Sequence, residues 1–481
     1  MGETLANTYC GNCHLVPEPT DLTRAIWLGK VLPQMGAMYG VYESQPRSYY
    51  LNGPQAPFIE DLYPEERLLD SADWANIVAY YLNLSLDELP ERQADLPLDE
   101  MTQFIPTYVE GDTSLANQPQ ATMIAFDPVR RQICVGGAYE RTNQLLYFSP
   151  QHSIIDTRPA NSSPVAFIAE EDLVLEIGSL LPSDIPIGGL SSLTEDGKLE
   201  TLLDSLLRPV DMLKMDLDLN GQNELIIAEY GNLKGRISAY EWNEYGQLMR
   251  KYILIQQAGA IRLRKADLNG DGNDDLIAMF GQGDESVKVA YSRSDGSLKM
   301  ETLLRFPPSY GSSDIEVIDF DKDGHLDLLT TNGDNYDYQP FPKPYHGIRY
   351  FRNQGDNSYQ EEWFYYLDGA YGVEVADFDL DGDNDIAAIA YFVPPTKRSV
   401  RSFVYLQQEP SRRGRLNFRA YSFRKPAGQY YLCLSSGDVD QDGDIDLLLG
   451  NFGAYLPDGM FGRSNRKEAQ AIYIYLDNQA K

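Results

Sequence analysis

The amino-acid sequence predicts a mainly β fold with a small, all-α domain at its N-terminus. Five short acidic turns, each with a glycine, recur in the last four-fifths of the 481-residue chain, and β-prone apolar runs flank them. The first 100 residues have none of these turns, and residues 22–35 and 73–82 instead predict helices. Because 481 residues exceed one ordinary core, we predict two domains, residues 1–100 and residues 101–481.

The five acidic turns share one pattern of oxygen-bearing side chains. In the third turn, carboxylates stand at positions 1, 3, 5 and 9, and Gly324 takes the sharp bend at position 6. Such an arrangement places hard oxygen donors inside a tight turn, and these donors suit Ca²⁺. An EF-hand begins in the same way, but its closing glutamate lies at position 12 and helices flank it. A single copy could be a solvated acidic turn, whereas five copies in register predict about five bound Ca²⁺ ions.

The candidate Ca²⁺ ligands are the residues at positions 1, 3, 5, 7 and 9 of each turn. They are Asp216, Asp218, Asn220, Gln222 and Glu224; Asp267, Asn269, Asp271, Asn273 and Asp275; Asp319, Asp321, Asp323, His325 and Asp327; Asp377, Asp379, Asp381, Asp383 and Asp385; and Asp438, Asp440, Asp442, Asp444 and Asp446.

These turns resemble the FG-GAP/VCBS repeats of integrin-type β-propellers, in which the metal loop joins the first two strands of each blade. Their starts lie 51 to 61 residues apart, which is enough for one four-stranded blade each. Segments near residues 127 and 172 have room for two degenerate blades without a metal loop. The resemblance and the spacing therefore predict a seven-bladed, calcium-binding β-propeller. Residues 104–109 could supply the strand that closes the ring.

The N-terminal domain carries a second motif, Cys10-Gly-Asn-Cys13-His14. In the attachment of a c-type haem, two thiols one helical turn apart form thioethers with the porphyrin, and the adjacent imidazole ligates iron. The alternatives are a redox Cys-x-x-Cys pair and half of a zinc site. No other histidine or cysteine pair precedes His152, so zinc would lack ligands. Together with the helix at residues 73–82, the motif resembles a small cytochrome c domain with one covalent haem.

The sixth iron ligand is predicted from the methionines of this domain. His14 is its only histidine, which leaves Met35 or Met38 as a thioether donor. We favour Met35, because it follows the break at Pro33, where similar cytochromes place an axial methionine. Both methionines could instead be core residues.

Charge and cysteine usage indicate which partners the protein can have and in which compartment it acts. The formal charge of −32 argues against nucleic acid or an anionic membrane surface as a partner, even with five Ca²⁺ ions bound. The sequence contains no run of 18 apolar residues, so it predicts no membrane span. Ca²⁺ turns and haem attachment favour the periplasm or the cell surface as the location of the protein.

Because the chain begins without an apolar signal segment, we expect a trimmed N-terminus, and any lipid anchor would have been lost with it. Cys134 and Cys433 are expected to be buried thiols rather than a disulfide.

Three long segments, residues 333–347, 391–402 and 451–470, are predicted on the propeller face opposite the metal turns, and they are aromatic and basic. They could bind a partner or merely cover the propeller channel. Since residues 1–100 have 16 acidic and 5 basic side chains, we predict that the helical domain docks on this basic face. The basic side chains concerned are Lys343, Lys397, Arg398, Arg401, Arg463, Arg466 and Lys467. The acidic linker at residues 87–99 restricts the search and so raises the effective concentration. The alternative is docking on the face of the metal turns, where bound Ca²⁺ would neutralise the carboxylates.

These observations predict an extracytoplasmic electron-transfer protein whose propeller recognises a redox partner protein, a glycan or an outer-membrane complex. No nucleophile–base pair, dinucleotide loop or pair of glycosidase carboxylates stands clear of the metal turns. An alternative is a propeller enzyme, polysaccharide-active or an oxidoreductase, that uses the haem as electron acceptor. Another is an accessory subunit of an outer-membrane assembly.

Overall fold

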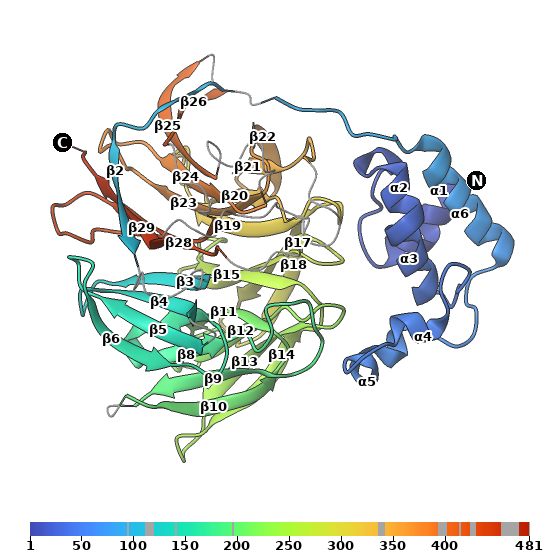
Figure 1. Cartoon of the computed structure of the whole chain (residues 1–481), viewed down its shortest axis with the longest axis horizontal. Coiled ribbons are helices and arrows are strands. Elements are labelled where there is room, and N and C mark those ends of the chain that lie inside the picture. Colours follow the sequence, from blue (N-terminus) through green and yellow to red (C-terminus); the bar gives the residue numbers. More distant parts are fainter. Residues whose placement is uncertain are drawn as a thin grey trace.

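The computed structural model contains a helical domain and a seven-bladed β-propeller (Figure 1). It describes residues 1–93, 96–110, 120–139, 142–194, 197–334, 342–392, 402–412, 415–423, 430–453 and 471–480. Among these residues, no helix is both long and apolar enough to cross a membrane.

The helical domain is built from six short helices. They are α1 (Gly2–Tyr9), α2 (Arg24–Ile26), α3 (Leu32–Met38), α4 (Arg47–Tyr50), α5 (Ala56–Ile59) and α6 (Ser71–Leu84). A π-helical turn, Trp27–Val31, makes α2 and α3 nearly continuous, so the helix predicted at residues 22–35 is confirmed with later bounds. The helix predicted at residues 73–82 is α6, and the carboxylate of Asp70 caps it by accepting the Ala72 N–H at 2.7 Å.

Helices α1 and α6 pack closely and enclose the core of this domain. Ala6 of α1 and Ile77 of α6 are completely buried, with Trp27 beside them in the same cluster. The backbones approach so closely that a Cβ on Gly2 would lie 2.4 Å from the Asn76 carbonyl oxygen. A glycine near the start of α1 therefore permits the crossing of the first and last helices.

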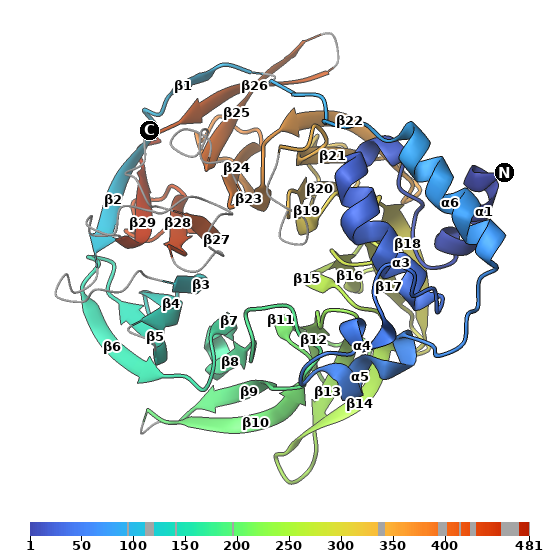
Figure 2. The ribbon, with the colours of Figure 1, turned by 45° about the vertical axis from the view of Figure 1, so that its right-hand side comes forward.

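The propeller consists of seven sheets arranged in a ring (Figure 2). Blade 1 is β3 (Gln120–Asp127), β4 (Gln132–Tyr139), β5 (Thr142–Phe148) and β6 (Ile154–Pro159); blade 2 is β7 (Pro164–Ile168), β8 (Leu173–Glu176), β9 (Gly188–Leu193) and β10 (Leu199–Leu206). Blade 3 is β11 (Pro209–Met215), β12 (Glu224–Glu229), β13 (Arg236–Trp242) and β14 (Leu248–Ile255); blade 4 is β15 (Ala260–Ala266), β16 (Asp275–Phe280), β17 (Ser286–Ser292) and β18 (Leu298–Arg305). Blade 5 is β19 (Ser312–Ile318), β20 (Asp327–Asn332), β21 (Gly347–Asn353) and β22 (Tyr359–Tyr366).

The last two blades include strands from the region before blade 1. Blade 6 is β23 (Ala370–Ala376), β24 (Asp385–Ala390), β25 (Phe403–Arg412) and β26 (Arg415–Ser422), with β1 (Leu98–Glu100) as a parallel fifth strand beside β26. Blade 7 is β27 (Tyr431–Gly437), β28 (Asp446–Asn451) and β29 (Ala471–Asn478), and β2 (Phe104–Glu110) completes it by pairing antiparallel with β29. The predicted closing strand at residues 104–109 is therefore confirmed, as are the two blades near residues 127 and 172.

The second strand of each blade that follows an acidic turn lies in the middle of the ring wall. All six residues of β12, β16, β20, β24 and β28 are buried. Their apolar side chains pack between neighbouring sheets, as Ile386 and Ala388 of β24 do in the cluster that includes Ile348 of β21. This packing holds the end of each acidic turn rigidly, because the last residue of the turn is the first residue of the buried strand.

The helical domain lies over one face of the propeller ring (Figure 2), and the loops that contact it emerge on the face opposite the acidic turns. The Tyr345 hydroxyl, in the β20–β21 loop, donates to the Asp21 carbonyl oxygen at 2.7 Å, and the Ser309 hydroxyl, in the β18–β19 loop, donates to the Asp21 carboxylate at 3.3 Å. Lys234, in the β12–β13 loop, forms an ion pair with Asp61 at 2.5 Å. These loops join second to third strands or neighbouring blades, so the predicted docking face is confirmed.

Only part of the predicted charge attraction can be followed at this interface. Lys343 is buried and donates to the Ser309 carbonyl oxygen at 3.2 Å, next to Asp21. The other six basic residues of the prediction lie outside the described residues. The linker contributes a further contact, because the Arg92 guanidinium lies 4.5 Å from the centre of the Phe364 ring.

Candidate metal centres and the Cys10–His14 segment

The five acidic turns connect the first and second strands of blades 3 to 7, where the sequence predicts them. In four of them the position-1 carboxylate accepts the N–H of the position-6 glycine, at 2.8 Å for Asp216, 2.8 Å for Asp267, 2.9 Å for Asp319 and 3.0 Å for Asp377. All five glycines have a left-handed φ, between 87° and 100°, which a residue with a Cβ adopts only at a cost. The glycine therefore turns the chain so that the acidic side chains converge.

The position-9 carboxylates are fixed most tightly. Glu224, Asp275, Asp327, Asp385 and Asp446 are each completely buried. One oxygen of Glu224, Asp275, Asp327 and Asp446 accepts the N–H of the position-2 residue, at 3.0 Å in every case. Burial raises the pKa of Asp275 and Asp446 to about 6 and that of Asp385 to about 7. Buried carboxylates of this kind need a compensating charge to remain ionised.

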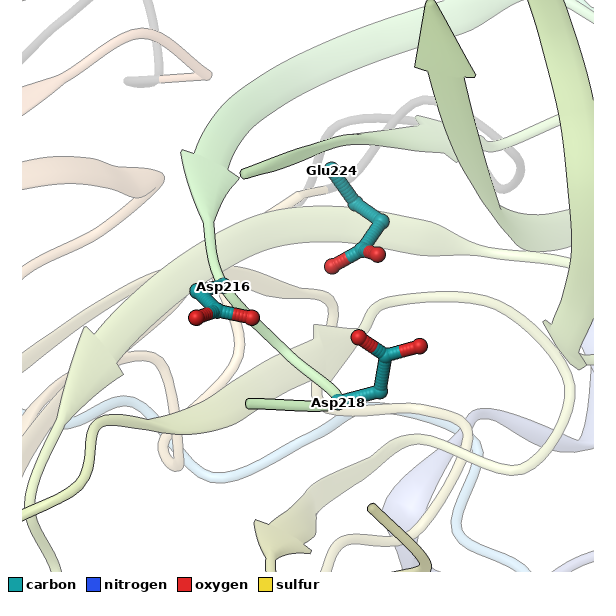
Figure 3. A group of neighbouring side chains, drawn as sticks. All are labelled: Asp216, Asp218 and Glu224. Atoms are coloured by element: carbon teal, nitrogen blue, oxygen red, sulfur yellow. The ribbon is translucent and has the colours of Figure 1, made fainter. Parts of the chain in front are cut away.

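Four turns bring three carboxylates together with ligand oxygens within 4.8 Å of one another. Figure 3 shows the group in the first turn, where the carboxylates of Asp216, Asp218 and Glu224 face a common point. The other groups are Asp319, Asp321 and Asp327; Asp377, Asp379 and Asp381; and Asp438, Asp440 and Asp446. The second turn has the same backbone bonds, but its position 3 is Asn269, so its three carboxylates stand at positions 1, 5 and 9 and do not form such a group.

Several of these carboxylate oxygens are buried without a hydrogen-bond partner in the described residues. They are Oδ1 of Asp218, Asp377, Asp383 and Asp438 and both oxygens of Asp444. An unpartnered buried oxygen is costly, and a bound cation would compensate it. The donor set, hard oxygens on a rigid turn, therefore fits Ca²⁺.

The position-5 residues have the same role in all five turns, whereas the position-7 residues differ in type and burial. One side-chain oxygen of Asn220, Asp271, Asp323, Asp381 and Asp442 accepts the N–H of its position-7 residue, at 2.8 to 3.2 Å. Gln222 and His325 are exposed at position 7, Asn273 and Asp383 are half-buried, and Asp444 is buried. Carboxylate at position 7 is thus a property of the fourth and fifth turns.

A residue that the sequence did not single out lies against the third turn. Arg352, on β21, contacts Asp321 Oδ2 at 2.7 Å and Asp323 Oδ2 at 2.8 Å. This contact depends on the pairing of β20 with β21, which places Phe351 opposite Leu328 and so brings Arg352 next to the turn. Nothing in the local sequence around Arg352 indicates it.

The Cys10–His14 segment follows α1 directly. Cys10, Gly11 and Asn12 form a 3-10 turn, and the Cys13 N–H donates to the Cys10 carbonyl oxygen at 3.2 Å. Both cysteines are free thiols; Cys10 is half-buried and Cys13 is exposed. The predicted spacing of one turn between the thiols is therefore present. His14 is half-buried, and its Nδ1 lies 2.9 Å from the Leu15 carbonyl oxygen.

The two candidate methionines pack in different places. Met35 contacts the main core cluster of the helical domain, which Cys10 also contacts. Met38 contacts a second cluster, formed by Ala37, Ile59 and Tyr63, which also receives Leu233 of the propeller. Only Met35 therefore shares a core with the cysteine motif. Cys134 and Cys433 are free thiols, as expected. Cys134, in blade 1, is buried, whereas Cys433, in blade 7, is only half-buried, so the prediction of two buried thiols holds for Cys134 alone.

A comparison with protein families supports the repeat that the acidic turns predict. Residues 267–330 match the model of the FG-GAP-like repeat, and this stretch contains the second and third acidic turns. No curated protein matches the chain in sequence. A crystal structure of a protein from Lactobacillus plantarum, a structural genomics target, covers 69% of this chain and 98% of its own, with 14% sequence identity and a TM-score of 0.45.

Proposed function

We propose that the chain is an extracytoplasmic electron-transfer protein. Its helical domain would carry one covalent haem on Cys10 and Cys13, with His14 and Met35 as axial ligands. Its propeller would be a recognition platform stabilised by Ca²⁺ at the acidic turns. When bound, the haem supplies the one-electron redox couple.

The observation that carries the proposal is the geometry of His14. Its Nδ1 can donate to the Leu15 carbonyl oxygen at 2.9 Å, and this bond leaves Nε2 without a proton. A metal-ligating histidine commonly orients itself in this way, with the other ring nitrogen donating to a carbonyl. His14 is thus held in the tautomer that an iron ligand needs, directly after two thiols one turn apart.

The state of Cys10 argues against the alternative of a redox dithiol. Burial raises the pKa of the Cys10 thiol to about 11. A thiol that acts in disulfide exchange has a lowered pKa, because the thiolate is the nucleophile. A half-buried thiol with a raised pKa would instead hold a haem through a thioether bond.

The packing of the methionines supports Met35 as the second axial ligand. Met35 and Cys10 contact one core cluster, whereas Met38 packs against a second cluster, which Leu233 of the propeller also contacts. A methionine ligand would favour a fairly high reduction potential.

The docking of the two domains supports a role for the propeller in partner binding. The segment after His14 ends at Asp21, which receives hydrogen bonds from two propeller loops. A redox partner protein, a glycan or an outer-membrane complex bound on the loop face would therefore lie near the haem attachment segment. The acidic composition favours a partner other than nucleic acid.

The test is covalent haem attachment. The chain is produced in the periplasm of cells with c-type cytochrome maturation, and its intact mass and reduced visible spectrum are recorded. We expect one haem per chain, lost in Cys10→Ala and Cys13→Ala. Cys433→Ala is the matched control, since Cys433 lies in blade 7, and it should keep the haem. An apo mass for the wild-type chain from these cells would overturn the proposal.

A further inference from the structure

Among the residues that the structure describes, the first acidic turn differs from the other four because a lysine ammonium pairs with its candidate ligand carboxylates. Lys251 Nζ, from β14, is 2.7 Å from Glu224 Oε1, 2.8 Å from Asp218 Oδ2 and 3.2 Å from Glu241 Oε2. These three carboxylates belong to the second strand, the turn and the third strand of blade 3. The side chain of Lys251 is 23% exposed and that of Glu224 is completely buried. The ammonium therefore reaches inside the turn rather than its outer rim.

A β-bulge directs Lys251 to this position. Ala239 pairs with Tyr252, but the next residue, Tyr240, pairs with Arg250, so Lys251 is the extra residue of β14. A bulge re-aims the side chain of its extra residue. Blade 5 has a bulge at the equivalent place. There Tyr350 pairs with Trp363 and Phe351 pairs with Glu361, so the acidic Glu362 is the extra residue of β22. The bulge is thus shared by blades 3 and 5, but its extra residue is a lysine in blade 3 and a glutamate in blade 5.

The contact of Arg352 with the third turn is different in kind. Arg352 pairs with the carboxylates at positions 3 and 5, while the position-9 carboxylate of Asp327 is bonded to Phe320 N and Asn353 N at 3.0 and 2.8 Å and to the Tyr350 hydroxyl at 2.9 Å. Lys251 instead bonds the position-9 carboxylate itself, together with position 3. Those are two of the three carboxylates that the first turn can offer to a metal ion.

We propose that the ammonium of Lys251 takes the place of Ca²⁺ in the first turn, so that the propeller binds Ca²⁺ at no more than four of its five acidic turns. This inference rests on the proposed binding of Ca²⁺ by the other turns. The carboxylates of Asp218 and Glu224 cannot serve a divalent ion and the ammonium together, because the two cations would repel each other at close range. Blade 3 would then depend less on Ca²⁺ than the other blades with acidic turns, since Lys251 already neutralises part of its charge, although Asp218 Oδ1 keeps no hydrogen-bond partner.

The experiment counts bound Ca²⁺. The full chain is stripped with a chelator, dialysed against Ca²⁺ and analysed for metal per chain. Lys251→Met removes the charge and keeps most of the side-chain volume, and bound Ca²⁺ can then compensate the buried Glu224. We expect Lys251→Met to bind one Ca²⁺ more per chain than the wild type. Lys265→Met is the control, since Lys265 lies beside the second turn but is 3.9 Å from the exposed, non-ligand Asp274; its count should equal that of the wild type.

Equal Ca²⁺ counts in the wild type and Lys251→Met would overturn the inference. Absence of bound Ca²⁺ from all three proteins would instead overturn the proposal that the acidic turns bind Ca²⁺. If Lys251→Met does not fold, anomalous scattering from Ca²⁺-soaked wild-type crystals decides the question. Ion peaks at other acidic turns and none at the first are expected, and a peak between Asp216, Asp218 and Glu224 would refute the substitution.

Discussion

Removal of Ca²⁺ should destabilise blades 6 and 7 more than blade 4. The fourth and fifth turns contain five buried carboxylate oxygens without a hydrogen-bond partner among the described residues: Asp377 Oδ1, Asp383 Oδ1, Asp438 Oδ1 and both oxygens of Asp444. No oxygen of this kind occurs in the described second turn, Asp267–Asp275. The ion is therefore most needed where blade 7 closes the ring through β2 and β29.

The size of the effect follows from these oxygens. Each unpartnered buried polar atom costs about 1–3 kcal/mol, so five cost about 5–15 kcal/mol if the turns stay rigid. Water enters a turn that relaxes, which favours the lower end, about 5 kcal/mol. Because about 1.4 kcal/mol is a tenfold change in an equilibrium constant, local opening of these blades should become at least about a thousandfold more frequent without Ca²⁺.

Hydrogen–deuterium exchange with and without a chelator measures this opening. Amides of β23, β24, β27 and β28 should lose protection by about that factor, and β2 should follow because it is held by blade 7. Asp444→Asn should bind one Ca²⁺ fewer and lose protection in blade 7 while blade 4 keeps it. Equal loss of protection in blades 4, 6 and 7, or no loss after verified removal of Ca²⁺, would refute the reasoning.

Three further predictions concern the helical domain. Met35→Ala should abolish the weak sulfur-to-iron band at the red end of the oxidised visible spectrum, and Met38→Ala should keep it; the reverse result would make Met38 the ligand. Burial raises the pKa of Asp21, which accepts a hydrogen bond from Ser309 of the propeller, to about 6. If this burial is relieved on undocking, protonation of Asp21 favours the docked state, and docking should weaken as pH rises from about 4 to about 6. Asp21→Asn should make docking, measured by small-angle scattering, independent of pH in this range, and a pH dependence equal to that of the wild type would contradict the assignment. Gly36→Ala would place a Cβ 2.8 Å from Cζ2 of Trp74 and should lower the free energy of unfolding by about 1–3 kcal/mol in a denaturant titration, whereas an unchanged midpoint would show that Trp74 moves freely.

Features carried by a few consecutive residues could be predicted from the sequence. The acidic turns, their glycines at position 6 and the turn between Cys10 and Cys13 depend on local backbone geometry, and the structure has them in the predicted places. The number of blades followed from the spacing of the turns, and the closing strand from the strand that blade 7 lacks. The docking face was also predicted, from loop length and charge, although Tyr345, Ser309 and Lys234 make the contacts that can be described.

Contacts between distant residues were decided only by the tertiary structure. Whether Lys251 or Arg352 reaches a turn depends on strand register and on a bulge, and a shift of one residue would point the side chain to the other face. The parallel pairing of β1 with β26, which brings Leu98–Glu100 into blade 6, likewise depends on an available strand edge at β26. The sequence by itself determined which turns have the ligands for Ca²⁺. The tertiary structure decided which of those ligands are already occupied by a cation of the chain, because register and bulges set which side chains meet across strands.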